Sequence, residues 1–418
     1  MRTMQWHATR NEPLSVTTPS PYAELTGEDG RALLAGLGAF SEERATDAAA
    51  YARARTTPDV AAAALATAFA RRRAIAAGKF AHADVMLFTR AGYEQATSEA
   101  VARHRAARFA AYSIVADLCC GIGGDAVALA GVTQCVNAVD LDPDALACAR
   151  ANAEALGVGS RVRIEVGDAL EFDLRGIEAA FADPSRRREG VRVRGAHRYA
   201  PPLEDLLARS AELPGSRLCV KVAPGLKFDD PAIRLPLGGA ALEIELVSER
   251  GTCKEAVLWC GDLARADGAR RATVIDAAGV HILDGDPAGK AALRGFGAYL
   301  GEPDAAVIRA GLIAALCDGS DAGPLDSRVA YLAADTPSPS PFVRWYPVIE
   351  AMPFNVKRVR ARLRALDIGQ LVVKTRAFPL PPEGVAALLK PEGSARATII
   401  CTTVREKKWA VLCGTVGA

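Results

Sequence analysis

Three aspartates stand at the ends of successive apolar runs in the middle of the chain. Asp117 closes the first run, Asp140 ends the second, and Asp168 follows the third in the segment VGDAL. Short apolar runs predict buried strands, and the carboxyl ends of parallel strands are where open α/β sheets bind ligands. We therefore expect these three carboxylates to bind the polar groups of one ligand.

A glycine-rich turn lies between the first two aspartates. Gly121, Gly123 and Gly124 follow the first run, and the small-residue segment Ala126–Ala130 precedes the second. Glycine lets the backbone approach a ligand where a Cβ would collide with it. The order strand, turn, helix, strand and acid is that of a nucleotide-binding β-α-β unit. The alternative is an ordinary crossover in which the acids cap helices.

The position of Asp117 before the turn distinguishes between two cofactors. A carboxylate there would repel a pyrophosphate, but it suits the ammonium group of a methionine moiety. Asp140 could accept hydrogen bonds from both ribose hydroxyls, and Asp168 could accept from the adenine amine while the Ala169 backbone contacts the ring. The pattern favours S-adenosylmethionine over NAD. For Asp168 the alternative is a turn aspartate, which is common after a strand.

A fourth apolar run is followed by Asp183-Pro184-Ser185-Arg186. Enzymes that methylate exocyclic amines place an acid or amide, a proline and usually an aromatic residue at this strand end. The acid and a backbone carbonyl would accept the hydrogens of the amine and direct its nitrogen at the sulfonium methyl group. Ser185 and Arg186 replace the usual proline and aromatic residue. Base stacking would then depend on the guanidinium of Arg186 or on Tyr199, and the sequence leaves both open.

Two groups of basic residues could contact RNA. The first is a glycine-interrupted loop directly after Asp183, a candidate phosphate clamp, with six arginines: Arg186, Arg187, Arg188, Arg192, Arg194 and Arg198. The second is one face of a predicted helix near the C-terminus, with Lys357, Arg360 and Arg364. In both cases the alternative is an ordinary solvated surface.

Composition restricts the possible classes of protein. The chain has 418 residues, of which half are hydrophobic, so it can form two or three domains. A net charge of +2 predicts that any nucleic-acid surface is a local patch. Ten cysteines without a CxxC pair and five scattered histidines predict reduced thiols, no metal site and a cytoplasmic location. No apolar run predicts a membrane span, and the oligomeric state is left open.

The elements that must position these residues form an α/β protein of several domains. Residues 1–110 predict a helical domain, because they show no strand-like alternation. Residues 111–262 alternate strand-like and helix-like stretches, which predicts a Rossmann-like, mostly parallel sheet with an antiparallel end pair. Residues 263–298 predict a hairpin or linker. Residues 299–418 predict a compact α+β domain, with the order helix, strand, helix, strand, strand from Asn355 onward.

Capping residues predict several helix boundaries. Thr57 followed by Pro58 predicts a helix start, and Gly78 predicts its end. Asp142 predicts the start of the helix that follows the second strand. The segment Ala91–Phe109 is expected to form a helix that leads into the first strand.

With these residues in hand, the chain resembles the bacterial and archaeal class I S-adenosylmethionine-dependent methyltransferases that carry a THUMP-like C-terminal domain. The resemblance rests on YEQATS (Tyr93–Ser98), DLCCGIGGD (Asp117–Asp125), VDLDPDALACARANAEALG (Val139–Gly157), DPSRR (Asp183–Arg187), VKVAPG (Val220–Gly225), KEAVLW (Lys254–Trp259) and the tail from Tyr299. The glycine and VDLDP segments are also similar to those of the cap trimethylguanosine synthases, which methylate the exocyclic amine of guanine.

The resemblance implies a cofactor, a transfer site and a class of substrate. Cofactor binding would fall to Asp117, Cys119, Gly121, Gly123, Asp140, Leu141, Asp168 and Ala169, and methyl transfer to Asp183 and Pro184. Because THUMP domains occur in RNA-modifying enzymes, the substrate would be RNA, contacted by Arg186, Arg187, Tyr199, Lys357 and Arg360. We hypothesise direct in-line transfer to a guanine amine. The rival hypotheses are a protein or small-molecule methyltransferase, and an RNA-binding protein that no longer turns over.

Overall fold

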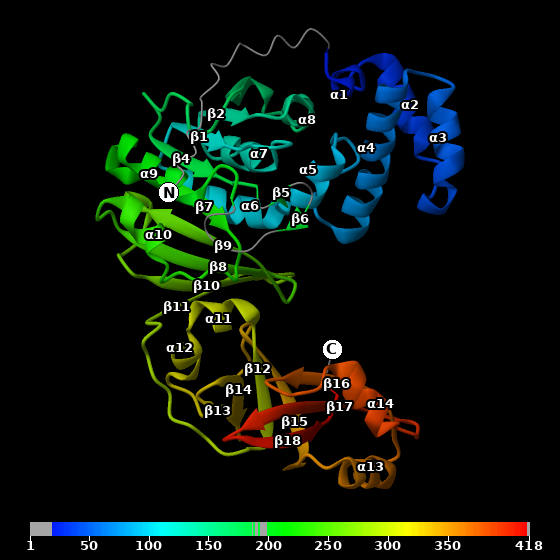
Figure 1. Cartoon of the computed structure of the whole chain (residues 1–418), viewed down its shortest axis with the longest axis vertical. Coiled ribbons are helices and arrows are strands. Elements are labelled where there is room, and N and C mark those ends of the chain that lie inside the picture. Colours follow the sequence, from blue (N-terminus) through cyan, green and yellow to red (C-terminus); the bar gives the residue numbers. More distant parts are fainter. Residues whose placement is uncertain (1–18, 186, 189–190, 193–198, 416–418) are drawn as a thin grey trace, which may run out of the picture. The chain divides into compact units, whose positions relative to one another are not determined.

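The computed structural model describes residues 19–185, 187–188, 191–192 and 199–415, and Figure 1 shows their helices and strands. The chain divides into two compact units, Met1–Glu178 and Ala179–Ala418. The finer division at residues 110, 262 and 298 remains our proposal for the domain boundaries.

Helices open the first unit, as the composition of residues 1–110 predicts. The long helix α4 (Pro58–Ala77) begins after Thr57, whose side chain accepts a hydrogen bond from the amide of Val60, and it ends at Gly78 with a left-handed φ of 56°. Both predicted boundaries of this helix are confirmed. Three further helices pack on α4: α1 (Pro21–Glu24), α2 (Glu28–Leu37) and α3 (Ala45–Arg53).

The segment expected to be one helix from Ala91 to Phe109 is two helices, α5 (Arg90–Gln95) and α6 (Glu99–Ala106). The chain extends between them, and Thr97 is buried there, where its hydroxyl accepts a hydrogen bond from Arg105. Arg105 also forms a buried ion pair with Asp125. These tertiary contacts explain the break, which local helical propensity does not predict.

The predicted β-α-β unit is present in the first unit. Its strands are β1 (Ile114–Leu118), β2 (Cys135–Asp140) and β3 (Val162–Val166), and both neighbouring pairs are parallel. The crossovers contain helices α7 (Gly124–Ala130) and α8 (Pro143–Ala155). Asp142 caps α8 as predicted, because its side chain accepts hydrogen bonds from the amides of Asp144 and Ala145.

The second unit begins with the other strands of the nine-stranded sheet. Among them, β4 and β7 are parallel, and β9 is antiparallel to β7 and β8. The complete strand order is β11-β10-β8-β9-β7-β4-β1-β2-β3. This is the predicted Rossmann-like α/β sheet, and the predicted antiparallel pair, β8 and β9, lies inside it rather than at its end, because β10 and β11 follow β8. The strands are β4 (Ala179–Ala182), β7 (Leu218–Val222), β8 (Leu242–Glu249), β9 (Thr252–Cys260), β10 (Arg270–Asp276) and β11 (Gly279–Gly285). The short helices α9 (Leu203–Ala208) and α10 (Pro231–Arg234) connect them.

The hairpin predicted within residues 263–298 is formed by β10 and β11, with Asp276 opposite Gly279. It also extends the sheet, because β10 pairs in parallel with β8 from Arg270 to Ile275. Residues 271–275 of β10 are buried, as a strand inside a sheet requires.

A second sheet follows, mostly antiparallel, in the order β13-β14-β12-β15-β18-β17-β16. Its strands are β12 (Tyr299–Pro303), β13 (Gly323–Asp326), β14 (Val329–Ala334), β15 (Val343–Pro353), β16 (Ile368–Arg376), β17 (Ala395–Val404) and β18 (Lys407–Cys413). The helices are α11 (Ala305–Ala310), α12 (Ile313–Cys317), α13 (Val356–Ala365) and α14 (Pro382–Leu389). The predicted order from Asn355 onward is confirmed.

Three general features of the described residues bear on the class of protein. No helix among them is both long and apolar enough to cross a membrane. The ten cysteines are thiols rather than disulfides. Within the same part of the chain, His, Cys, Asp and Glu side chains do not gather in groups of three or more that could hold a metal ion.

Candidate functional site

The turn after β1 brings the backbone into an unusual conformation at three residues. Cys119, Gly121 and Gly123 have φ angles of 69°, 53° and 80°, all in the left-handed region. The amide of Cys119 donates to the carbonyl oxygen of Val139 at 2.9 Å, which ties the turn to β2. A Cβ added at Gly123 would lie 3.0 Å from the Cβ of Ala149, so this glycine lets α8 pack closely.

Gly121 has a different role, because a Cβ added there would meet no atom within 4 Å. Its backbone therefore faces open space, which a ligand can approach closely. The amide of Gly121 donates to Oδ2 of Asp140 at 2.8 Å. The turn is thus held by the acid at the end of the neighbouring strand.

Asp140 lies at the tip of β2, as predicted, and joins two loops. Besides the amide of Gly121, it accepts a hydrogen bond from the amide of Asp142, through Oδ1 at 3.0 Å. A carboxylate has about four lone-pair positions, so about two remain for ligand hydroxyls. Leu141 follows directly and is 65% exposed, which offers an apolar surface beside the acid.

Asp168 lies in the loop after β3, and its Oδ1 accepts a hydrogen bond from the amide of Leu170 at 2.8 Å. This is the contact of a turn aspartate, the alternative that the sequence left open. Ala169 beside it is buried. The role of Asp168 and Ala169 in binding adenine remains a prediction.

Asp117 differs from the other two acids, because it is 0% exposed at the end of β1. A ligand ammonium would have to reach the base of the turn to contact it, so its assignment to the cofactor stays a prediction. Burial, and then the charges of Asp117 and Asp140, raise the pKa of the Cys120 thiol well above its usual value. Cys120 is therefore a neutral thiol and a poor nucleophile.

Sequence reasoning missed Asn152, which holds the glycine turn from behind. This α8 residue is 0% exposed. Its side-chain oxygen accepts from the amide of Leu87 at 2.7 Å, and its nitrogen donates to the carbonyls of Leu87 and Ile122 at 3.0 and 2.9 Å. The available signal was an amide at helical spacing from Ala145 and Cys148 on the buried face of α8.

Asp183 follows β4 directly, as predicted, and forms an ion pair with Nζ of Lys221 at the end of β7. The two strands are parallel with Ala182 opposite Val220, so the two side chains follow at neighbouring strand ends. Pro184, the next residue, is buried. Lys221 enters the sequence reasoning only within the VKVAPG segment, with no role of its own.

The described ends of the arginine loop lie close together. Ser185 and Ala200 form a β-bridge, with backbone hydrogen bonds of 3.0 and 2.9 Å. Within the loop, β5 (Arg187–Arg188) pairs with β6 (Val191–Arg192). Arg186 lies outside the described residues. The hairpin therefore begins four residues after Asp183 in the chain.

Tyr199, the second candidate for base stacking, is buried, and its hydroxyl accepts a hydrogen bond from the amide of Ala223 at 2.8 Å. It connects the end of the arginine loop to the segment after β7. In the structure Tyr199 therefore joins two segments through a hydrogen bond, and its role in base stacking remains a prediction.

The second basic group lies on α13, as predicted. Val359 and Leu363 are buried on one face, and Lys357 is exposed. Nε of Arg360 donates to the carbonyl oxygen of Leu388 at 2.8 Å, near the end of α14. Arg360 therefore joins two helices, and a role of Lys357 and Arg360 in binding RNA stays a prediction.

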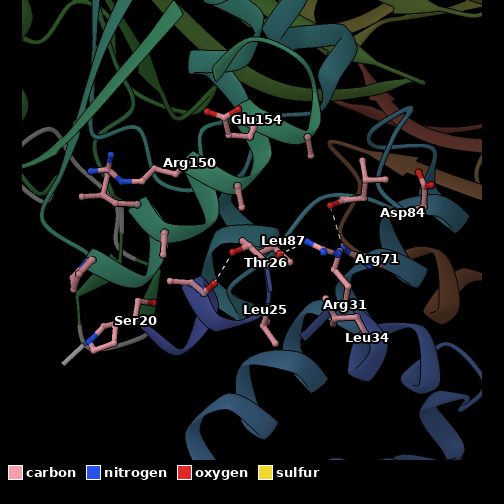
Figure 2. Close-up of a pocket in the computed structure, with 18 of the residues that line it drawn as sticks. Ser20, Leu25, Thr26, Arg31, Leu34, Arg71, Asp84, Leu87, Arg150 and Glu154 are labelled. Carbon is pink, nitrogen blue, oxygen red and sulfur yellow. Dashed lines mark hydrogen bonds between the residues drawn. The ribbon is translucent and has the colours of Figure 1, made fainter. Parts of the chain in front are cut away.

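A cavity of about 990 Å³ lies elsewhere in the first unit, between the N-terminal helices and α8 (Figure 2). Its walls include Leu25, Leu34 and Leu146, but none of the three strand-end aspartates. Arg71 on its wall donates to the carbonyl oxygens of Met86 and Val85 at 2.7 and 3.1 Å. The cavity is therefore separate from the glycine turn.

Comparison with known proteins identifies the family. Residues 112–200, which contain the glycine turn and Asp183, match the family model described as RNA cap guanine-N2 methyltransferase, and residues 343–415 match the THUMP domain-like model. Uncharacterized S-adenosylmethionine-dependent methyltransferases from two Mycobacterium tuberculosis strains are 35% identical over 319 residues, covering 76% of this chain and 85% of each relative. The chain belongs to this family of S-adenosylmethionine-dependent methyltransferases. Its enzyme class is therefore methyltransferase, in agreement with its fold.

A solved structure supports the fold of this methyltransferase. The crystal structure of a candidate methyltransferase from Porphyromonas gingivalis W83 superposes with a TM-score of 0.69 at 18% identity, covering 90% of this chain and all of that one. At this identity the likeness concerns the fold alone.

The residues at the glycine turn fit S-adenosylmethionine. The open space at Gly121 admits a ligand, Asp140 retains acceptor positions for ribose, and Leu141 presents apolar surface. When bound, the cofactor supplies an electrophilic methyl group on its sulfonium. The chain supplies the contacts that bind and orient the cofactor.

Cys119 gives a first prediction, on stability. A left-handed φ costs an L-residue about 1 kcal/mol or more, a cost that glycine avoids. We expect Cys119→Gly to have a free energy of unfolding about 1 kcal/mol higher than Cys119→Ala, measured by urea denaturation. At Cys135, which lies in β2, the order should reverse, because glycine weakens a strand interior. An alanine variant as stable as the glycine variant at position 119 would contradict the prediction.

Proposed function

We propose that this methyltransferase acts on RNA and methylates the exocyclic amine of a guanine. The observation that carries the proposal is the acid and proline at the end of β4, with Asp183 oriented by an ion pair and an arginine hairpin that begins four residues later. An ionised carboxylate only accepts hydrogen bonds, so it suits an N–H donor such as an amine. The match of residues 112–200 to the guanine-N2 methyltransferase model supports the same substrate class.

The proposed reaction is a direct displacement. The amine nitrogen forms a bond to the methyl carbon as the carbon–sulfur bond breaks, and the positive charge passes from sulfur to nitrogen. The nitrogen then releases a proton, which the Asp183 carboxylate can accept and pass to water. The main contribution of Asp183 is to hold the amine in line with the methyl group, which is a positioning effect.

The arginine hairpin supports a substrate with phosphates. Arg187, Arg188 and Arg192 lie within two short paired strands, the first of which starts four residues after Asp183. Guanidinium groups bind phosphate oxygens in pairs, so a basic hairpin at this position would hold a nucleic-acid backbone beside the target base. The THUMP domain-like match at residues 343–415 adds a second candidate RNA surface.

The direct test is methylation of RNA from cells that lack this enzyme, because the target site in that RNA is unmethylated. Purified protein, labelled S-adenosylmethionine and total RNA from a strain lacking the gene should yield labelled N2-methylguanosine in nucleoside mass spectrometry. RNA from the parent strain, already methylated at the site, should accept much less label. Label in a protein or small-molecule fraction would favour the first rival hypothesis. Cofactor binding in calorimetry without any labelled product would favour the RNA-binding rival.

The same assay can separate RNA from other substrates through the arginine hairpin. Replacing Arg187, Arg188 and Arg192 together by alanine should raise the KM for RNA at least about tenfold, since each lost phosphate contact weakens binding and reduces its salt dependence. Arg53→Ala, at an exposed position on α3, is the matched control and should leave KM unchanged. An unchanged KM in the triple variant would argue against RNA at this hairpin.

A further inference from the structure

A buried lysine lies next to the candidate transfer site. Lys221 is the last residue but one of strand β7 and is 8% exposed, and its ammonium group pairs with Oδ2 of Asp183. A buried charge is costly unless a partner of opposite charge balances it. The pair therefore constrains both side chains: the ammonium favours one position of the carboxylate, and the carboxylate compensates the buried ammonium.

The backbone around Lys221 is fixed from two sides. On one side, β7 pairs with β4 up to Ala182, the residue before Asp183. On the other, the amide of Ala223 donates to the hydroxyl of Tyr199. Lys221 thus lies between two backbone segments that are held by hydrogen bonds. Its position relative to Asp183 is set by strand pairing rather than by a loop. A group held in this way can orient a reacting partner within the narrow tolerance that catalysis needs.

We propose that Lys221 is a positioning residue for methyl transfer. By engaging Oδ2 it fixes the plane of the Asp183 carboxylate, so that Oδ1 points in one direction and accepts the N–H of the substrate amine. Lys221 acts through Asp183 and does not itself touch the methyl group. This inference rests on the proposed function, because it assumes that Asp183 receives the amine.

The test compares two substitutions of Lys221 in the full-length enzyme with total RNA from the deletion strain. Lys221→Met keeps most of the aliphatic chain and removes the charge, and Lys221→Arg keeps a cationic donor. We expect Lys221→Met to lower kcat about 100-fold, because a small misplacement of a reacting group has an effect of that size. Lys221→Arg should recover most of this loss. The dissociation constant for S-adenosylmethionine, measured by calorimetry, should change less than about threefold in both variants, because the cofactor contacts are elsewhere.

A purely structural role of Lys221 predicts a different pattern. It would reduce the fraction of folded enzyme but leave kcat per cofactor-binding molecule unchanged, so rates are normalised to binding sites counted by calorimetry. If Lys221→Met gives too little folded protein, Lys221→Gln, which keeps a donor without the charge, is measured in the same way and is expected to fall between Met and Arg. A normalised kcat within about threefold of the unaltered enzyme in the Met or Gln variant would overturn the inference.

A double substitution adds an independent check. If Lys221 acts through Asp183, adding Lys221→Met to Asp183→Asn should lower kcat by less than about threefold, because residues that act as a unit are not additive. Multiplicative losses would show that Lys221 acts separately and would also overturn the inference. If the unaltered chain transfers no methyl group to RNA, the proposed function fails and this inference fails with it. Normal transfer that Lys221→Met leaves unchanged contradicts this inference alone.

Discussion

Replacing Asp183 with alanine is expected to lower kcat for RNA methylation about 10³-fold, because the amine loses the acceptor that holds it in line with the methyl group. The dissociation constant for S-adenosylmethionine should stay within about threefold of its original value, since the cofactor is assigned to residues of the glycine turn and the strand ends that follow it. Single-turnover kinetics with labelled cofactor measures the first quantity, and calorimetry measures the second.

Two further variants make this expectation specific. Asp183→Asn keeps an oxygen acceptor but not its charge, and should lie between alanine and the parent in kcat. Asp173→Ala removes an exposed acid that pairs with Arg175, and should leave both quantities unchanged. Alanine also takes an acid partner away from the buried ammonium of Lys221, so urea denaturation must confirm that the variant is folded. Equal losses of turnover and cofactor affinity would contradict the separation of roles.

Replacing Asp140 with alanine should instead weaken cofactor binding about 10³-fold. Each of the two ribose hydroxyls would lose one hydrogen bond to the carboxylate, and hydrogen bonds to a charged acceptor contribute about 1.5–3 kcal/mol each. The variant also releases the amide of Gly121, which loosens the turn itself. At saturating cofactor, kcat should fall far less than it does in Asp183→Ala. Calorimetric titration with S-adenosylmethionine gives the affinity directly.

The matched variant is Asp140→Asn, whose remaining oxygen can still accept from the amide of Gly121 or Asp142. It should retain more affinity than alanine, and the difference reports how much of the effect depends on charge. If Asp140→Ala bound the cofactor as tightly as the parent, the assignment of the ribose to this strand end would be wrong.

Much of the fold could be predicted because it depends on local signals. Thr57, Gly78 and Asp142 mark helix boundaries through hydrogen bonds within a few residues, and short apolar runs mark the parallel strands. The break between α5 and α6 could not be predicted, since it depends on Arg105 and the distant Asp125. Strands β12 to β15 were missed for a related reason. β12 pairs with β14 and β15, which lie well beyond it in the sequence, and β15 contains Pro347, which argues against a strand in sequence reasoning.

The candidate site likewise has a part that the sequence predicts and a part that it does not. The positions of Asp140 and Asp183 follow from strand ends, which the sequence reveals. The long-range contacts around the site do not, because Lys221 lies 38 residues after its partner Asp183, and Asn152, which supports the glycine turn, lies 65 residues after its partner Leu87. A buried lysine or asparagine in an apolar run is a visible signal, but its partner becomes known only when the chain is folded.

The amide of Asn152 has a consequence for the N-terminal helices. It bonds to Leu87 and, at the same time, to Ile122 inside the glycine turn. Ile122 also shares one apolar core with residues of α2 and α4. The helices that precede the sheet thus pack behind the glycine turn, and a truncated enzyme beginning at β1 would leave the buried side of that turn open to water.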